Sequence, residues 1–410
     1  MTIIYLYQYF TTPKVSGGTR AYDLAKKFVQ NGHEVIFITT SHGFSHKPEG
    51  RWQYLELEQM KFYILNIEKT SNSTSYFKRI INFLIFIWFA SFKILKINGD
   101  VVLASSTPLT IGIPALVKKW KDKTPFIFEA RDVWPEAVIA IGAIKNKIAQ
   151  SVLYKLEATI YKNATAIVPL SVDMKTSISR RYPNLKCPII SIENIAALER
   201  FKEGYDPNVS LLHQHLGFKP RFTVLYAGTF GRVNGLSYVV EFAAKLKNMD
   251  SSIVFVLIGL GAEKEILISK AKEYGLLGKS VFIFGPVPKE QLPQYYYEVD
   301  MGSSFVIAIK ELWANSANKF FDSLAAGRPV LINHEGWQKD VLLQSNSGFI
   351  LPHDSTKIDE KVLNDFINYS TNHSLLKEQK RNSLELADKY SLDTAVKKYL
   401  DLFSSIGLTT

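Results

Sequence analysis

The sequence contains a single cysteine and lacks the side-chain spacings that bind metals. Cys187 is the only cysteine in 410 residues, which excludes an internal disulfide and favours a reducing compartment. No reactive motif surrounds Cys187, so we interpret it as a small buried apolar residue rather than a catalytic thiol. The eight histidines are scattered, and the close pair His213 and His215 has no cysteine or carboxylate companions. We therefore predict no metal site, and chemistry without a metal ion or another cofactor.

Features of membrane-spanning, exported and nucleic-acid-binding chains are also missing. No apolar run reaches the roughly 20 residues needed to cross a bilayer, and the strand-like segment 3–6 stands where a secretory leader would begin. The net charge is +11, but the basic residues are dispersed and no nucleic-acid-binding motif is present. We expect no nucleic-acid partner and interpret the charge as serving a phosphorylated substrate or an anionic lipid surface.

The length and the pattern of the chain predict two domains. At 410 residues the chain exceeds one ordinary hydrophobic core, and its 47% hydrophobic and 21% charged residues are typical of a globular protein. Strand-like and helix-like segments alternate in both halves, with glycine and proline interrupting the pattern between about residues 197 and 221. We predict an α/β fold of two doubly wound, Rossmann-like domains that face each other across a cleft.

The expected strands are short apolar runs. They are 3–6, 35–38, 100–104, 126–128, 166–168, 222–226, 253–258, 281–284, 302–305 and 329–332. Ligands of such sheets bind at the carboxyl ends of the strands, so the segments that follow these runs are the candidate sites. No Gly-x-Gly-x-x-Gly turn follows the first run, which argues against a dinucleotide oxidoreductase.

The segment 315–330 predicts an anion site on a short helix. Ser316 stands at the expected N-cap, and Gly327 ends the helix. Backbone N–H groups at the helix start, together with the helix dipole and the charge of Lys319, would attract a diphosphate. Asp322, about one turn later, would accept hydrogen bonds from two ribose hydroxyls. The alternative is an ordinary capped helix with a solvated lysine and aspartate.

Glycine turns follow other strand-like runs. Gly228 and Arg232 follow the run 222–226, where glycine lets the backbone approach a phosphate and the guanidinium can fork onto its oxygens. Gly17 and Gly18 form the matching turn after the first strand. Gly259 follows a third run and is a candidate to close over a nucleotide. Ordinary tight turns are the alternative for all of these positions.

The segment 129–136 places ionisable residues directly after the run 126–128. Arg131 would keep the neighbouring Asp132 ionised, so that this carboxylate can accept a proton or orient a hydroxyl. The alternative is a structural ion pair that precedes a helix start at Pro135.

An apolar, aromatic stretch lies between residues 76 and 97, with basic residues at both ends. It is too short to span a bilayer, but its composition suits a helix that lies at the lipid headgroups with Trp88 inserted. A helix buried all round in an α/β domain is the alternative.

Taken together, these residues resemble bacterial family-4 retaining glycosyltransferases of the GT-B fold, in particular O-antigen and capsule enzymes typified by N-acetyl-L-fucosamine transferases. The resemblance runs nearly end to end. Its anchors are the segments 16–20, 31–35, 129–136, 226–232 and 316–330. It implies a donor domain at residues 201–389 and an acceptor domain at residues 1–200, completed by a helix at about 390–410.

The resemblance also implies roles for single residues. Arg232 and Lys319 would hold the diphosphate, and Asp322 would hold the ribose as the second acid of the family's Glu-x7-Glu pair. The predicted donor-binding set is Gly17, Gly18, Gly228, Arg232, Gly259, Ser316, Ala317, Asn318, Lys319 and Asp322. Asp132 would replace the active-site histidine of many relatives and, with Arg232 and Lys319, make up the catalytic set. Arg131, Trp134 and Glu136 would contact the acceptor.

The chain departs from the family pattern at three positions. The second acid is aspartate, the position of the first acid holds Ala314, and the lysine that many members carry shortly after Arg232 is absent. Glu311 lies close enough in sequence to Ala314 to be a candidate replacement. These departures leave the donor sugar open.

The resulting hypothesis is a retaining, metal-independent transferase. It would move a sugar from a UDP-linked donor to a lipid-linked acceptor, a polyprenyl-diphosphate saccharide, on the cytoplasmic face of the inner membrane. The membrane contact would be made through residues 76–97. A non-hydrolysing nucleotide-sugar epimerase and a non-catalytic nucleotide-sugar-binding partner are the alternatives.

Overall fold

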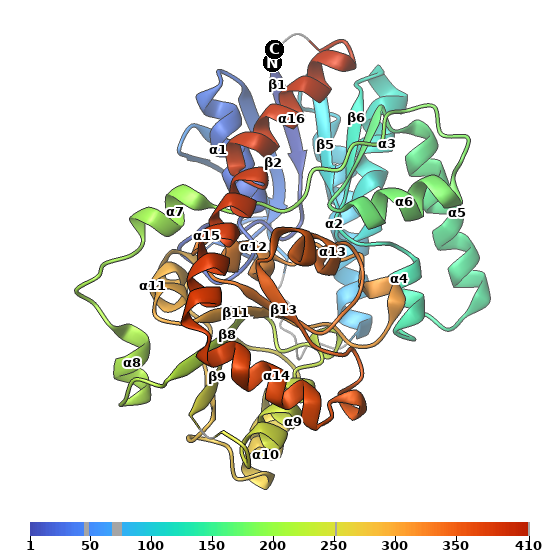
Figure 1. Cartoon of the computed structure of the whole chain (residues 1–410). Helices are drawn as coiled ribbons and strands as arrows, with labels where there is room; N and C mark the ends of the chain where they lie inside the picture. The colour runs from blue at the N-terminus through green and yellow to red at the C-terminus, as the bar shows by residue number, and fades with distance from the viewer. Residues whose placement is uncertain (45–48, 68–75, 251, 409–410) are drawn as a thin grey trace.

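The computed structural model describes residues 1–44, 49–67, 76–250 and 252–408, the side chains of residues 76–79 excepted. Two sheets form the framework, and their strands are parallel except for the edge strand β3, which is antiparallel to β4 (Figure 1). The first sheet has seven strands in the order β3-β4-β2-β1-β5-β6-β7, and the second has six in the order β10-β9-β8-β11-β12-β13. The prediction of two doubly wound α/β units is therefore confirmed. The domain boundary near residue 200 stays a prediction.

The central strands form because each is a short run of apolar residues that is buried on both faces. In the first sheet the strands are β1 (Thr2–Leu6), β2 (Glu34–Thr40), β3 (Trp52–Leu57), β4 (Met60–Leu65), β5 (Val101–Ser105), β6 (Phe126–Ala130) and β7 (Ala166–Pro169). In the second they are β8 (Phe222–Ala227), β9 (Ile253–Ile258), β10 (Val281–Phe284), β11 (Met301–Ser304), β12 (Val330–Ile332) and β13 (Gly348–Ile350).

Helices cover both faces of each sheet and bury their apolar sides against it. Around the first sheet lie α1 (Arg20–Gln30), α2 (Tyr76–Ile94), α3 (Gly112–Asp122), α4 (Glu136–Ala140), α5 (Lys147–Asn163) and α6 (Val172–Arg181). Around the second lie α7 (Leu198–Glu203), α8 (Leu211–Leu216), α9 (Ser237–Leu246), α10 (Lys264–Glu273), α11 (Leu292–Tyr297), α12 (Asn318–Ala325), α13 (Trp337–Ser345), α14 (Glu360–Thr371) and α15 (His373–Lys389).

The last helix, α16 (Leu392–Ser405), returns to the first sheet and lies beside α1 (Figure 1). Tyr399 and Phe403 of α16 are fully buried in the same core cluster as Phe28 of α1. The crossing helix expected near the C-terminal end of the sequence is present, and it belongs physically to the first sheet.

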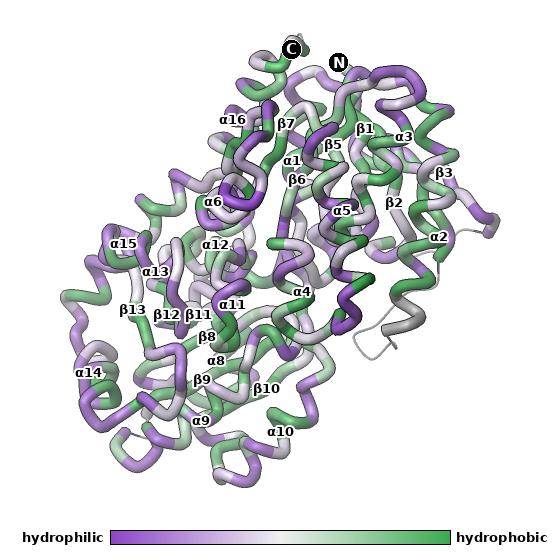
Figure 2. Tube along the Cα trace, turned by 90° about the vertical axis from the view of Figure 1, so that its right-hand side faces the viewer, coloured by the Kyte–Doolittle hydropathy of each residue, from purple (hydrophilic) through white to green (hydrophobic). Residues whose placement is uncertain are grey.

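Helix α2 is apolar on two sides but buried on only one. Phe86 and Ala90 are at most 1% exposed, whereas Leu84, Trp88 and Phe92 are 59%, 63% and 53% exposed. The alternative of a helix buried all round is therefore wrong. Figure 2 shows α2, α3 and α5 on the same face of the molecule, with apolar colouring along much of α2. Among the helices within the described ranges, none has the length and apolar character needed to cross a membrane.

Candidate active site between the two sheets

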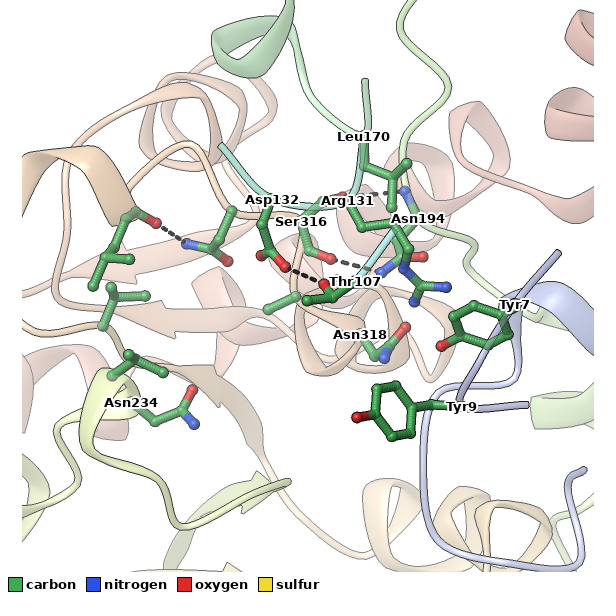
Figure 3. Close-up of a pocket in the computed structure, with 15 residues that line it drawn as sticks. Tyr7, Tyr9, Thr107, Arg131, Asp132, Leu170, Asn194, Asn234, Ser316 and Asn318 are labelled. Carbon is green, nitrogen blue, oxygen red and sulfur yellow. Dashed lines mark hydrogen bonds between the residues drawn. The ribbon is translucent and has the colours of Figure 1, made fainter. Parts of the chain in front are cut away.

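A cavity of about 430 Å³ lies where the carboxyl ends of the two sheets face each other. Its walls come from the loops that follow β1, β5, β6 and β7 of the first sheet and β8 and β11 of the second (Figure 3). In both sheets the topology changes direction here, since β1 neighbours both β2 and β5, and β8 neighbours both β9 and β11. Such switch points are the usual ligand sites of doubly wound folds.

The loop after β6 brings a carboxylate to the cavity. Asp132 accepts a hydrogen bond of 2.7 Å at Oδ2 from the hydroxyl of Thr107 (Figure 3). Asp132 is exposed on the cavity side, while the protein packed around its other sides raises the pKa of the carboxyl group above the ordinary value, although Thr107 and Arg131 oppose the shift. A carboxylate with a raised pKa beside an open cavity is suited to accept a proton.

Arg131 lies on the same wall, with its guanidinium 5.0 Å from the centre of the Tyr7 ring. Its Nη1 atom is buried and has no hydrogen-bond partner within the described part of the chain. Two other residues predicted beside it point elsewhere. Trp134 packs against the core of the first sheet, and Glu136 lies 3.5 Å from Arg181 and accepts a hydrogen bond from Ser177. Neither of these two lines the cavity.

On the side of the second sheet, Lys319 occupies the first turn of α12, directly after Asn318 of the cavity wall, and is not itself a lining residue. It is 9% exposed, its Nζ lies 3.1 Å from Oδ1 of Asn234, and it sits 5.0 Å above the Tyr226 ring. Burial lowers the pKa of this amine to about 8, although Asp322 opposes the shift. The amine is therefore a cation that lacks enough solvent or counter-charge, a condition that a bound anion would relieve.

The start of α12 differs from the expected one. The helix begins at Asn318, its N-cap residue is Ala317, and no side chain caps it. The hydroxyl of Ser316 instead accepts a hydrogen bond of 3.1 Å from the backbone N–H of Asn194. The prediction that Ser316 caps the helix is therefore wrong, because a contact from the other half of the molecule uses its hydroxyl. Ser316, Ala317 and Asn318 all line the cavity.

The second predicted cation, Arg232, begins the turn that contains Asn234, the contact of Lys319. Its side chain is exposed, and it makes no hydrogen bond or ion pair with the rest of the described chain. Arg232 is not part of the cavity wall. The structure therefore brings the two cation-bearing segments to one edge of the second sheet, where Lys319 is buried, Arg232 is exposed and neither side chain lines the cavity.

Asp322 does not face the cavity as a free carboxylate. It is 3% exposed, and its Oδ2 lies 2.5 Å from Nζ of Lys289, which is 5% exposed. Lys289 follows β10 and was not singled out in the sequence. The available signal was a lysine placed just beyond the carboxyl end of a buried strand.

The predicted glycines allow close approaches between loops. A Cβ at Gly18 would lie 2.6 Å from Nδ2 of Asn318, so glycine at this position lets the first loop touch the start of α12. A Cβ at Gly259 would lie 1.9 Å from the carbonyl oxygen of Gly228, which excludes any larger residue. Gly17 has a φ of +145°, which favours glycine. Phosphate contacts by these glycines stay a prediction.

The position of the missing acid is apolar. Ala314 packs against a small buried cluster of Val133, Leu170 and Met174, and its carbonyl oxygen accepts a 2.7 Å hydrogen bond from Ser171. Glu311 is exposed on a short 3-10 turn and is not among the residues that line the cavity. The structure therefore does not bring Glu311 to the place of the first acid.

Several hydrogen bonds close the space between the halves. The Asn194 amide donates to the carbonyl oxygen of Ser316 at 2.6 Å, and the backbone N–H of Trp337 donates to Asp173 at 2.9 Å (Figure 3 shows the first). These contacts flank the cavity. In this structure both halves therefore contribute to the walls of one open cavity.

Comparisons with known proteins agree with this architecture. Residues 17–200 match the family model described as Glycosyltransferase Family 4, and residues 210–382 match the one described as Glycosyl transferases group 1. The colanic acid biosynthesis glycosyl transferase WcaI of Escherichia coli (strain K12) is 25% identical over 177 residues, which are 41% of this chain and 42% of that protein. The matched part thus spans less than half the length of that relative.

Solved structures share the fold over the whole chain. Sucrose-phosphate synthase from Thermosynechococcus elongatus has a TM-score of 0.74 at 15% identity, covering 99% of this chain and 98% of that one. Anabaena HepE in complex with UDP has a TM-score of 0.70 at 14% identity, covering 99% and 100%. WaaG, a glycosyltransferase involved in lipopolysaccharide biosynthesis, has a TM-score of 0.66 at 15% identity, covering 98% and 99%.

Proposed function

We propose that this chain, a glycosyltransferase of the GT-B fold with a Family 4 half and a group 1 half, transfers a sugar from a UDP-linked donor to a lipid-linked acceptor. The observation that carries the proposal is the buried Lys319 amine at the start of α12, beside a cavity that both halves line. Its cost of burial is offset when a diphosphate binds, because opposite charges attract strongly away from water.

The donor half is the second sheet and its loops. The N–H groups at the start of α12 and the Lys319 amine face the place of the diphosphate, and Arg232 closes on it from the exposed turn. The structure of HepE, which shares the fold, was obtained with UDP, and that relative supports uridine as the nucleotide. The identity of the sugar is open, because an apolar cluster around Ala314 replaces the family's first acid.

In the proposed reaction the bond between the anomeric carbon and the UDP oxygen breaks, and the acceptor oxygen forms the new bond on the same face of the sugar. Lys319 and the helix start stabilise the negative charge that develops on the departing diphosphate. Asp132 takes the proton of the acceptor hydroxyl, a role supported by its position and by the raised pKa of its carboxyl group. The scheme uses no metal ion.

The acceptor is proposed to be held at a lipid surface. Leu84, Trp88 and Phe92 expose an apolar ridge along α2, and Phe83 of the same helix contacts the ring of Tyr9, which lines the cavity. A headgroup-level helix next to the site would present a lipid-linked saccharide to the cavity. Roles in O-antigen or capsule synthesis and a place on the cytoplasmic face of the inner membrane remain part of this proposal.

The direct test offers a panel of UDP-sugars with and without a polyprenyl-diphosphate saccharide. We expect UDP release that depends on the acceptor, and we expect Lys319→Ala to lose at least about 100-fold in rate while keeping its fold, the usual effect of losing one charge-stabilising group. Donor conversion without an acceptor would instead indicate an epimerase. UDP binding with no turnover on any acceptor would indicate a non-catalytic binding protein.

A further inference from the structure

Lys289 is a buried lysine that the reaction scheme does not use. It stands in a 3-10 turn, Lys289–Gln291, that follows β10, and its side chain is 6% exposed. Its Nζ lies 2.5 Å from Oδ2 of Asp322, whose side chain is 5% exposed. A buried ion pair of this kind is costly to form and becomes strongly unfavourable when one partner is removed. The ion pair therefore fixes the position of the Asp322 carboxylate in the protein interior.

The ion pair also affects the balance of charge around Asp322. Lys319 lies three positions before Asp322 on α12, so one buried carboxylate is flanked by two buried amines. Since Lys289 contacts Asp322 directly, the charge of Lys319 remains available to a diphosphate. On the other side of Asp322 lie Tyr296 of α11 and, across a small gap, the charged groups of the first half, which are Arg20, Asp23 and Arg200.

The two arginines across that gap already have carboxylate partners of their own. Arg200 forms an ion pair with Asp23, and Arg20 forms one with Glu129. Neither arginine forms a hydrogen bond or ion pair with Asp322 within the described ranges. Lys289 is therefore the cation that holds the Asp322 carboxylate.

The backbone around Lys289 touches the other half of the molecule. The N–H of Lys289 donates to the carbonyl oxygen of Val15 at 3.2 Å, and the N–H of Glu290 donates to that of Pro13 at 3.1 Å. Residues 13–15 lead into the Gly17-Gly18 turn at the edge of the cleft. Opening of the cleft would break these two bonds and release the turn that places the Lys289 amine.

We propose that Lys289 is a positioning residue that fixes the Asp322 carboxylate for contact with the ribose, and that it links the ribose site to closure of the two halves. The inference rests on the proposed function, a uridine nucleotide bound by the second half, and on the ribose-binding role of Asp322 that the resemblance to the family implies. It concerns how the Asp322 carboxylate is held in place to bind the ribose, which the resemblance to the family does not specify.

The test titrates UDP and 2′-deoxy-UDP into the wild type, Lys289→Gln and Lys289→Arg. We expect Lys289→Gln to bind UDP about tenfold more weakly at pH 7.5 and to lose most of its preference for UDP over the deoxy nucleotide, since a hydrogen bond to a charged group is affected. Lys289→Arg should restore both properties.

The possible outcomes distinguish a failure of the proposed function from a failure of the role of Lys289. If the wild type does not bind UDP, the proposed function fails. If the wild type binds UDP but Lys289→Gln keeps the same affinity for UDP and the same preference for the 2′-hydroxyl, the role of Lys289 is wrong. Should Lys289→Gln fail to fold, the apolar pair Lys289→Met with Asp322→Leu replaces it. That double variant must bind both nucleotides equally, and a retained preference for UDP overturns the inference.

Discussion

The Lys319 amine and the Asn234 amide oxygen lie 3.1 Å apart, which joins the start of α12 to the turn after β8. A neutral amide oxygen compensates only part of the solvation that the amine loses on burial, so the pKa of Lys319 falls to about 8. Burial therefore leaves a partly neutral amine at a place where, in the proposed reaction, a diphosphate binds.

Nucleotide binding should therefore take up protons. Near pH 8.5 more than half of the Lys319 amines are neutral in the free protein, and a diphosphate favours the charged form, so its binding raises the pKa and draws a proton from the buffer. Calorimetric titrations of UDP in buffers of different ionisation enthalpy measure this uptake. It should be present at pH 8.5, much smaller at pH 6.5, and absent in Lys319→Met. Equal uptake by the variant would assign the proton to another group.

Asp132 should control the acidic side of the rate profile. Because loss of solvation raises the pKa of Asp132, the fraction in the base form falls at a higher pH than for an ordinary aspartate, and transfer should slow as the pH decreases through that pKa. Asp132→Asn should reduce the rate by about 100-fold or more, with UDP affinity unchanged within about twofold. Initial rates across pH and UDP titrations measure the two effects. A variant with a normal rate would exclude Asp132 as the base.

The exposed ridge of α2 should govern binding to lipid. Leu84 and Trp88 are 59% and 63% exposed, and burying each side chain in a bilayer interface is worth roughly 1.5–3 kcal/mol. Leu84→Ser combined with Trp88→Ser should weaken binding to vesicles that contain anionic lipid by more than about tenfold, as measured by flotation. Leu343→Ser is the matched control, since Leu343 is 60% exposed on α13, around the other sheet. Unchanged flotation of the double variant would contradict a membrane role for this ridge.

The hydroxyl of Tyr399 should stabilise the first half of the molecule. It donates to the buried carboxylate of Glu129, which also forms a 2.9 Å ion pair with Arg20. Tyr399→Phe should lower the free energy of unfolding by about 1–3 kcal/mol, because a buried charged acceptor loses a donor. Tyr274→Phe, at a tyrosine that is 39% exposed, should change it by less than about 0.5 kcal/mol. Denaturant titration of the three proteins measures the difference.

The pKa of Glu129 in this network predicts how the stability of the fold changes in acid. Burial raises the pKa of Glu129, but Arg20 and Arg131 outweigh burial and hold it below the ordinary value of 4.5. The ionised form therefore stabilises the fold above that value, and its contribution is lost as the pH falls through the lowered pKa. The stability difference between Tyr399→Phe and the wild type should accordingly shrink in strong acid.

Most of the framework could be predicted because parallel strands buried on both faces appear in the sequence as uninterrupted apolar runs. The hairpin β3–β4 was missed for a local reason. Its turn is formed by Glu58 and Gln59 with φ of 50° and 63°, and neither residue is one of the glycines or asparagines that normally mark such a turn.

The site was predicted less completely because its decisive contacts join distant positions. Lys289 and Asp322 are 33 residues apart, and Asn194 and Ser316 are 122 residues apart, so no local pattern relates them. The residue types around 316–322 were sufficient to predict an anion site. They were not sufficient to show that Lys289 forms an ion pair with the Asp322 carboxylate, or that Asn194 of the other half donates a hydrogen bond to the Ser316 hydroxyl.

The return of α16 to the first sheet also constrains how the chain folds during synthesis. Phe28 packs against Tyr399 and Phe403 of α16. The ribosome must therefore add more than 370 residues after Phe28 before α16 can bury this part of the core. Until then the nascent N-terminal half exposes an apolar surface on α1 and β1. A nonsense mutation that removes only α16 would therefore leave the strands and helices of the second sheet in the chain and yield a product that chaperones retain or proteases degrade.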